Sequence, residues 1–279
     1  FEFRVLAREL GHNYGLQSAN RLDAAGSDPL TGTPVELGDQ YDVMGANTGG
    51  QPLHFNEWFK AYLGWINFYN ALGNSTVRLF RHDHPSASGT RAITLGQQGD
   101  RAYWLGYRRQ HATNSFLNNG LEIRWGMQPA TVNTNTGLLE MGITNDMSSA
   151  GSVLINTTPA VADFSQHPLP LNQTFYDSNN FVSITPVAMG GTAPAEFMDV
   201  NIRYDPPKII TQPQPLSVTA SIGDTLSLSV DAVGILLLHY QWRFNSNSIA
   251  GETNSYLSLL ITSTNQSGYY SVRITNRGG

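Results

Sequence analysis

The chain of 279 residues contains no cysteine, which excludes disulfide scaffolds, cysteine-ligated zinc, iron–sulfur clusters and thiol catalysis. Charge is scarce too, because only 13% of the residues are charged, against about 25% in an ordinary globular domain. With 16 basic and 21 acidic residues, the chain lacks the basic surface that nucleic-acid binding requires, so we expect no nucleic-acid partner. No run approaches the about 18 consecutive apolar residues of a membrane span, so we expect none.

Turn-forming residues are abundant instead, with 27 glycines and 14 prolines. The length predicts two or three domains, and two shifts in composition favour three. Residues 1–70 show helical patterns, whereas residues 71–205 and 206–279 show the period-two alternation of strands. We therefore expect a multi-domain, mainly β protein, with a partial α+β head followed by two β-sandwiches.

The head is expected to hold two helices. Apolar residues recur at helical spacing near residues 5–14, and Gly15 is well placed to end that helix. A second helix is expected at residues 55–66, with Asn56 as a candidate cap. Between them, residues 20–50 are rich in glycine, aspartate, proline and asparagine, which indicates a long loop.

Short strands are expected throughout the second domain. Clusters of glycine, asparagine, proline and serine separate them, as in an all-β sandwich. A proline-containing linker at residues 204–208 then leads into the last domain. The clearest strands of the second domain are predicted at residues 77–80, 102–105, 121–125 and 182–185.

Residues 207–279 resemble the immunoglobulin-like repeats of large bacterial surface and secreted proteins. Trp242 stands where such domains bury a tryptophan, and Tyr270 stands at the position of the tyrosine corner. Val230 and Val272 occupy the two positions that hold a disulfide in antibody domains, so we expect apolar packing there instead. The resemblance implies a spacer more than a ligand-binding module, and a domain that stops before its last strand.

A zinc-peptidase pattern lies in residues 8–18, which read RELGHNYGLQS. Metzincin peptidases carry H-E-x-x-H-x-x-G-x-x-H followed by a methionine turn. Glu9, His12 and Gly15 match that motif, and Met44 lies in a segment, GDQYDVMG, that resembles the turn. Together with flanking residues, this pattern resembles the gametolysin-like metzincins.

The resemblance implies a secreted zinc metalloendopeptidase of bacterial origin that acts on a protein or peptide. In that family two histidines one helical turn apart and a third after the glycine hold the zinc ion. Glu9 would take a proton from zinc-bound water, His12 would be a zinc ligand, and Met44 would lie beneath the metal. Because the chain begins only a turn or two before this helix, residues 1–70 would be the C-terminal part of a peptidase domain, and the chain an internal fragment.

Two ligand positions depart from the family pattern. Arg8 replaces the first histidine and Ser18 the third. A guanidinium group has no free lone pair and repels a cation, and a serine hydroxyl is a poor zinc ligand. We therefore expect a degenerate zinc site and an inactive pseudoenzyme. The alternative function is a non-catalytic extracellular adhesion or scaffold protein, with partners at an extracellular surface.

Two weaker metal candidates remain. Asp23, Asp28, Asp39 and Asp42 offer oxygen ligands for Ca²⁺, but their spacing favours structural capping. The sequence His82-Asp83-His84 places two imidazoles on one strand face, but no third ligand is near in sequence, and a solvated loop is favoured. A third functional class, a carbohydrate-binding sandwich, would use aromatic side chains that we expect in the core: Trp58, Trp65, Trp104 and Trp125.

Overall fold

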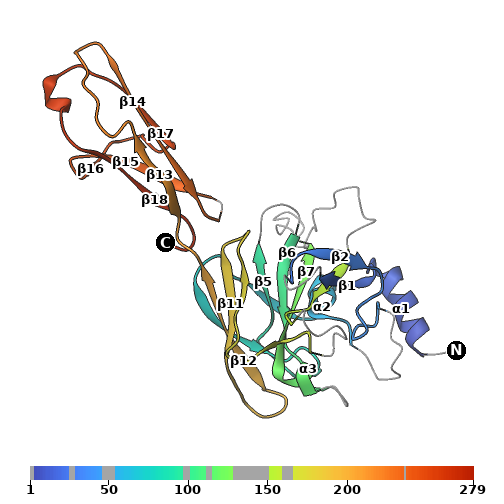
Figure 1. Ribbon diagram of the computed structural model, residues 1–279. Coiled ribbons are helices and arrows are strands. Elements are labelled where there is room, and N and C mark those ends of the chain that lie inside the picture. Colours follow the sequence, from blue (N-terminus) through green and yellow to red (C-terminus); the bar gives the residue numbers. More distant parts are fainter. Residues whose placement is uncertain are drawn as a thin grey trace, which may run out of the picture. The chain divides into compact units, whose positions relative to one another are not determined.

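The computed structural model is mainly β and divides into two compact units (Figure 1). Unit 1 comprises Phe1–Asp177 and Ser183–Ile202, and unit 2 comprises Ser178–Val182 and Arg203–Gly279. The mainly β, multi-domain prediction is confirmed at this level. The residues that the structure describes are 3–24, 29–45, 54–96, 101–110, 115–127, 151–158, 166–235 and 237–279.

The largest sheet of unit 1 contains eight strands in the described residues, in the order β2-β1-β8-β7-β6-β5-β3, with β9 paired to β7. Most neighbours are antiparallel, but β1 pairs with β8 and β3 with β5 in parallel. The strands are β1 (Ala19–Ala24), β2 (Gly32–Val35), β3 (Asn67–Asn70), β5 (Thr90–Gly96), β6 (Arg101–Gly106), β7 (Gly120–Met127), β8 (Ser152–Ile155) and β9 (Leu169–Pro170).

A second sheet of unit 1 has the order β10-β11-β12-β4. Its inward side chains alternate with outward ones along β12, as in a sheet with one buried face. The predicted strands at 77–80 and 182–185 lie in this sheet, and those at 102–105 and 121–125 lie in the larger one. Its strands are β4 (Ser75–Phe80), β10 (Phe175–Asp177), β11 (Val182–Gly190) and β12 (Phe197–Tyr204).

Among the described residues, three helices accompany these sheets: α1 (Phe3–Asn13), α2 (Glu57–Tyr62) and α3 (Ser115–Asn119). Gly15 has a φ of +84°, which glycine adopts without strain, and the predicted end of α1 there is confirmed. Asn56 caps α2, because its side-chain oxygen accepts a hydrogen bond from the amide of Phe59 at 3.0 Å. The helix is shorter than predicted because the chain turns at Leu63 and at Gly64, whose φ is +71°.

The long loop expected at residues 20–50 is wrong in part, since β1 and β2 form an antiparallel pair there. The large sheet also contains strands from before and after residue 70 of the sequence, where a domain boundary was predicted. One buried cluster joins the end of α1, the Met44 turn and α2 to strands β5 and β6. The predicted domain boundaries at residues 70 and 205 stay predictions. The cluster comprises Leu16, Ala19, Met44, Trp58, Phe59, Ala61, Ile66, Ala92, Ala102 and Trp104.

Unit 2 contains two three-stranded sheets with apolar side chains between them. Every second residue of β14 is buried over most of its length, so the alternation in the sequence places leucine and valine inside. One sheet has the order β13-β14-β17 and the other β16-β15-β18. The strands are β13 (Lys208–Gln214), β14 (Thr225–Val233), β15 (His239–Phe244), β16 (Asn247–Ser248), β17 (Tyr256–Leu260) and β18 (Tyr270–Thr275), with a short 3-10 helix at Thr264–Gln266.

Three residues expected to organise this core do so. Trp242 is fully buried, and its indole Nε1 donates a hydrogen bond to the carbonyl of Asn254 at 3.0 Å. Val230 is buried, and Val272 packs against the same cluster from the other sheet. Both valines therefore take part in one apolar core, as expected in place of a disulfide. In the part of the chain that is described, no helix is both long and apolar enough to cross a membrane.

Candidate functional site

Helix α1 lies directly on the methionine of the predicted turn. A Cβ atom at Gly11 would lie 2.5 Å from the Met44 sulfur, so a larger residue there would force the buried Met44 side chain to shift. Met44 is fully buried, and its backbone carbonyl accepts a hydrogen bond from the amide of Ala19 at 3.1 Å. The segment after Gly15 therefore runs back beside the methionine turn.

The ring of His12 is oriented by a hydrogen bond to the backbone. Its Nδ1 lies 2.9 Å from the backbone carbonyl of Leu16, so Nδ1–H donates and Nε2 keeps its lone pair. Glu9 is exposed on the same helix. Arg8 and Ser18, at the other two ligand positions, supply no lone pair suited to zinc. The buried Arg8 Nε has no hydrogen-bond acceptor among the described residues, and such a donor calls for an anion or a carbonyl rather than a cation.

The contact between Gly11 and Met44 can be tested by a double-mutant cycle. Gly11→Ala introduces a methyl group against a buried side chain, and Met44→Ala removes that side chain. In the double variant the methyl group fills part of the vacated space, so we expect a coupling energy of about 1–2 kcal/mol. Urea unfolding of the wild type and the three variants measures it. Strictly additive losses would show that the two residues are not in contact.

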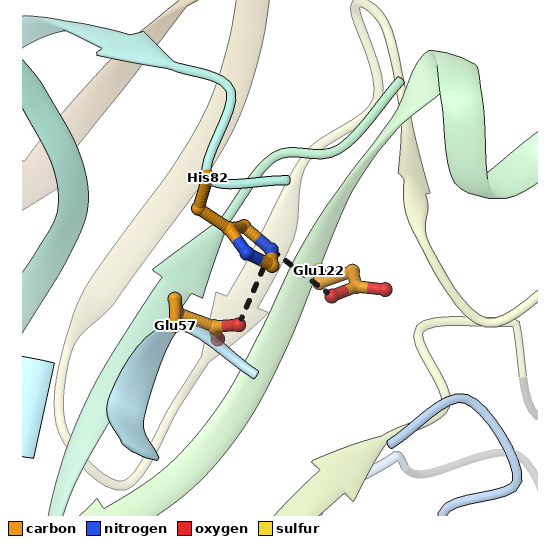
Figure 2. Close-up of side chains that lie close together, drawn as sticks. All are labelled: Glu57, His82 and Glu122. Carbon is orange, nitrogen blue, oxygen red and sulfur yellow. Dashed lines mark ion pairs between the residues drawn. The ribbon is translucent and has the colours of Figure 1, made fainter. Parts of the chain in front are cut away.

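A second site lies deeper in unit 1, where three side chains meet with no solvent exposure (Figure 2). Glu57 comes from α2, His82 from the segment after β4, and Glu122 from β7. His82 Nε2 lies 3.9 Å from Glu57 Oε2 and 4.0 Å from Glu122 Oε2. The three donor atoms all lie within 4.8 Å of one another.

Arg124 connects the two carboxylates of this site to the methionine turn. From the same strand as Glu122, its guanidinium donates to Glu57 Oε1 at 2.9 Å, to Asp39 Oδ2 at 2.7 Å and to Glu122 Oε2 at 3.2 Å. Arg108 donates to the same oxygen of Glu122 at 2.7 Å. All these charged groups are buried, so each depends on its partners to offset desolvation.

The position of His82 is fixed by hydrogen bonds at both its backbone and its ring. Its amide donates to the carbonyl of Tyr107 at 2.9 Å, and its own carbonyl accepts from Lys60 Nζ at 2.8 Å. Lys60 Nζ also lies 3.2 Å from His82 Nδ1. The ring is thus held with Nε2 directed toward the two carboxylates, as Figure 2 shows.

Burial dominates the proton affinities of the cluster. It raises the pKa of Glu57 to about 7, although Arg124 opposes the shift. It lowers the pKa of Lys60 to about 8, with Arg108 adding to the effect. Burial, together with Lys60, holds the pKa of His82 well below its usual value, so the imidazole is neutral at neutral pH. For Glu122 burial favours the protonated acid, but Arg108 and the other neighbouring donors hold its pKa well below the usual range.

The solvated loop expected around His82 is wrong. His82 and Asp83 are only 3% and 2% exposed, because Asp83 accepts hydrogen bonds from Arg81 and from two backbone amides after β6. The weaker candidate, a metal pair of His82 with His84, is not formed among the described contacts, since His84 Nδ1 accepts a hydrogen bond from the amide of Ser86. The partners of His82 come from distant parts of the sequence.

The aspartates proposed for Ca²⁺ have other partners. Asp39 accepts hydrogen bonds from the amide of Tyr41 and from Arg124, and Asp42 accepts from the amides of Met44 and Asn56. These contacts are those of structural caps. Asp23 pairs with Arg21, and Asp28 lies outside the described residues. A calcium site is thus still only a prediction.

The four tryptophans do not form one surface. Trp58 and Trp104 are buried in the core of unit 1, as expected. Trp65 is 53% exposed, so the expectation of a core position is wrong there. Trp125 is partly buried on β7. These different environments provide no platform of stacked aromatic side chains for a sugar.

Sequence reasoning missed Glu57, Glu122 and Arg124. One signal was present: in a chain with few charges, Glu57 precedes Trp58-Phe59, and the other two alternate with Leu121, Ile123 and Trp125. Charges inside apolar, aromatic stretches indicate buried pairing when both signs occur together. The distances between these residues along the chain hid which pairs form.

His54, beside this cluster, predicts one pH effect. Its pKa is lowered from 6.5 to about 4 by burial and by Lys60 and Arg108. Between these values the unfolded chain binds a proton that the folded chain does not, so this residue lowers stability as the pH falls. His54→Gln removes the contribution, and the variant should lose less stability than the wild type between about pH 7 and about pH 4.5. Urea midpoints at both pH values test this, and equal losses would contradict it.

Comparisons with known proteins found no match to this chain. No protein-family model matches the chain, and no curated protein and no solved structure matches it either. The resemblance to metzincins therefore depends on the residues quoted above and on the geometry around α1.

Proposed function

We propose that this chain is a non-catalytic extracellular module built on a metzincin-like head, and that it acts in adhesion or as a scaffold. The observation that carries the proposal is a combination of two features. The packing of helix α1 on Met44 agrees with the motif, but the residues at two ligand positions are unsuitable for zinc. Met44 packs beneath Gly11, as a methionine turn would, yet Arg8 and Ser18 stand where zinc needs histidine. A catalytic zinc site takes three protein ligands, and His12 alone does not suffice.

The preserved frame supports descent from a peptidase. The helix carries Glu9 and His12, Gly15 allows the sharp exit, and the chain then passes beside Met44. These are the roles that the motif assigns to those positions. The hydrogen bond from His12 to Leu16 further supports an orientation inherited from a ligand.

Unit 2 supports the extracellular part of the proposal. Its two sheets enclose Trp242, and the hydroxyl of Tyr270 donates to the carbonyl of Gln266 at 2.9 Å, as in a tyrosine corner. Val230 and Val272, from different sheets, both pack into this core at the positions where antibody domains have a disulfide. An immunoglobulin-like spacer is common in surface proteins, although fold alone does not establish function.

Peptidase assays test the proposal. The wild type should cleave neither casein nor a library of fluorogenic peptides above the rate of the Glu9→Gln variant, with zinc added. The Arg8→His/Ser18→His double variant serves as the comparison, because it supplies both missing ligands on the same frame. Cleavage by the wild type that a chelator and Glu9→Gln both abolish would overturn the proposal.

A further inference from the structure

Three buried atoms in the cluster of Glu57, His82 and Glu122 have no hydrogen-bond partner among the described residues: Glu57 Oε2, His82 Nε2 and Glu122 Oε1. Glu122 Oε1 lies 3.6 Å from His167 Nε2. The first two atoms face each other at 3.9 Å, too far for a direct hydrogen bond, and both of their side chains are fully buried. Buried polar groups are almost always paired, so such a gap indicates a bound group between them.

A glycine in the neighbouring strand leaves the space for this gap. Gly106, opposite Glu122 in the pairing of β6 with β7, lies against the carboxylate of Glu57. A Cβ atom at Gly106 would come within 2.5 Å of Glu57 Oε2, so a larger residue would displace that carboxylate. Two of the three distances between these atoms are 3.9 and 4.0 Å and the third is within 4.8 Å, so an ion equidistant from all three lies no more than about 2.5 Å from each. Zinc–ligand bonds are about 2.0–2.2 Å long. Small shifts of the side chains would close the difference.

The charge of the surroundings also favours a cation. Four buried carboxylates face three buried cations, which leaves one negative charge in excess when all are ionised. Removing such an excess by a bound cation stabilises the folded state, because an uncompensated buried charge is strongly unfavourable. The carboxylates belong to Asp39, Asp42, Glu57 and Glu122, and the cations are Lys60, Arg108 and Arg124.

We propose that Glu57, His82 and Glu122 bind one divalent transition-metal ion, for which Zn²⁺ is the probe. One imidazole and two carboxylates are ligands that such ions accept, whereas Ca²⁺ prefers six to eight oxygens. The ion would link α2, the segment after β4, and β7. Because no ligand is exposed, its role is structural, and it is independent of the non-catalytic function proposed above.

Which ring nitrogen of His82 carries the proton determines whether an ion or a water molecule fills this gap. When Nδ1 carries the proton, it donates a hydrogen bond to Lys60, which is then a neutral amine. Nε2 then offers its lone pair to the metal. When Lys60 is an ammonium group and donates to Nδ1, the ring proton lies on Nε2, and a water molecule fills the gap. These two states give different outcomes in the experiment below.

The experiment compares zinc content and thermal stability of the chelator-treated whole chain and its variants after addition of Zn²⁺. We expect the wild type to bind about one equivalent that Glu57→Gln loses and His12→Gln keeps. The Tm of the wild type should rise by several degrees with Zn²⁺ well above Kd, and not with Ca²⁺. Glutamine keeps the oxygen that accepts from Arg124, and circular dichroism checks that the variant is folded.

Gly106→Ala is the second variant, since it displaces Glu57 without removing a charge, and it replaces Glu57→Gln if that protein does not fold. Loss of the equivalent in either folded variant supports the site. Equal zinc content in the wild type and in every folded one of these two variants overturns it, as does a wild-type Tm that Zn²⁺ leaves unchanged. Zinc that is lost with His12→Gln but kept with Glu57→Gln would place the metal at α1, and would also overturn this site.

Discussion

Arg124→Gln is expected to cost unit 1 about 3–5 kcal/mol of stability, or to prevent it from folding. The guanidinium is fully buried and donates to Asp39, Glu57 and Glu122. Without it, three carboxylates stay in a low-dielectric interior with too few cations. Urea unfolding followed by far-ultraviolet circular dichroism measures the loss.

Arg21→Gln is the matched control for this prediction. The ion pair between Arg21 and Asp23 is as short as the one between Arg124 and Asp39, 2.7 Å, but both of its side chains are substantially exposed. Solvent screens such a pair, so its loss should cost less than about 1 kcal/mol. Similar losses for Arg124→Gln and Arg21→Gln would show that the charged cluster of unit 1 is solvated rather than buried.

Trp242→Ala should destabilise unit 2 by about 3–5 kcal/mol. The side chain is fully buried between the two sheets, and its hydrogen bond to Asn254 is lost as well. Hydrogen exchange measured by mass spectrometry localises the effect, because peptides from β14 and β15 should lose protection. Peptides from β6 and β7 of unit 1 should keep theirs.

Tyr269→Ala provides the comparison within unit 2. This side chain is 87% exposed and lies just before β18, so its removal should change stability by less than about 0.5 kcal/mol. Unchanged protection of β14 in Trp242→Ala would contradict the packing of the two sheets around this residue.

The core of unit 2 could be predicted from local pattern alone. Its strands alternate strictly, so Leu226, Leu228 and Val230 could be assigned to one face from the sequence. Trp242 could be assigned to the core from the resemblance to immunoglobulin-like domains, which bury a tryptophan at this position. The β1–β2 pair within residues 20–50 was not predicted, because β1 also pairs with β8, which is distant in the sequence and which no local pattern reveals.

The buried cluster could not be predicted in the same way. Alternation places Glu122 and Arg124 on one face of a strand, but it does not show whether solvent or protein covers that face. His82 follows a strand as loop residues do, and its hydrogen bonds to Tyr107 and Lys60, both distant in the sequence, hold it inside. Pairing of Glu57 with Arg124 spans 67 residues, and no local spacing encodes a contact of that range.

The absence of a catalytic zinc site at α1 is tested most directly by the zinc stoichiometry of three proteins: the wild type, His12→Gln, and Arg8→His/Ser18→His. Any zinc held by Glu57, His82 and Glu122 is present in all three proteins, so it does not affect the differences in zinc content between them. The account predicts equal zinc in the wild type and His12→Gln, and about one further equivalent in the double variant. A wild type that holds about one equivalent more than His12→Gln would contradict it.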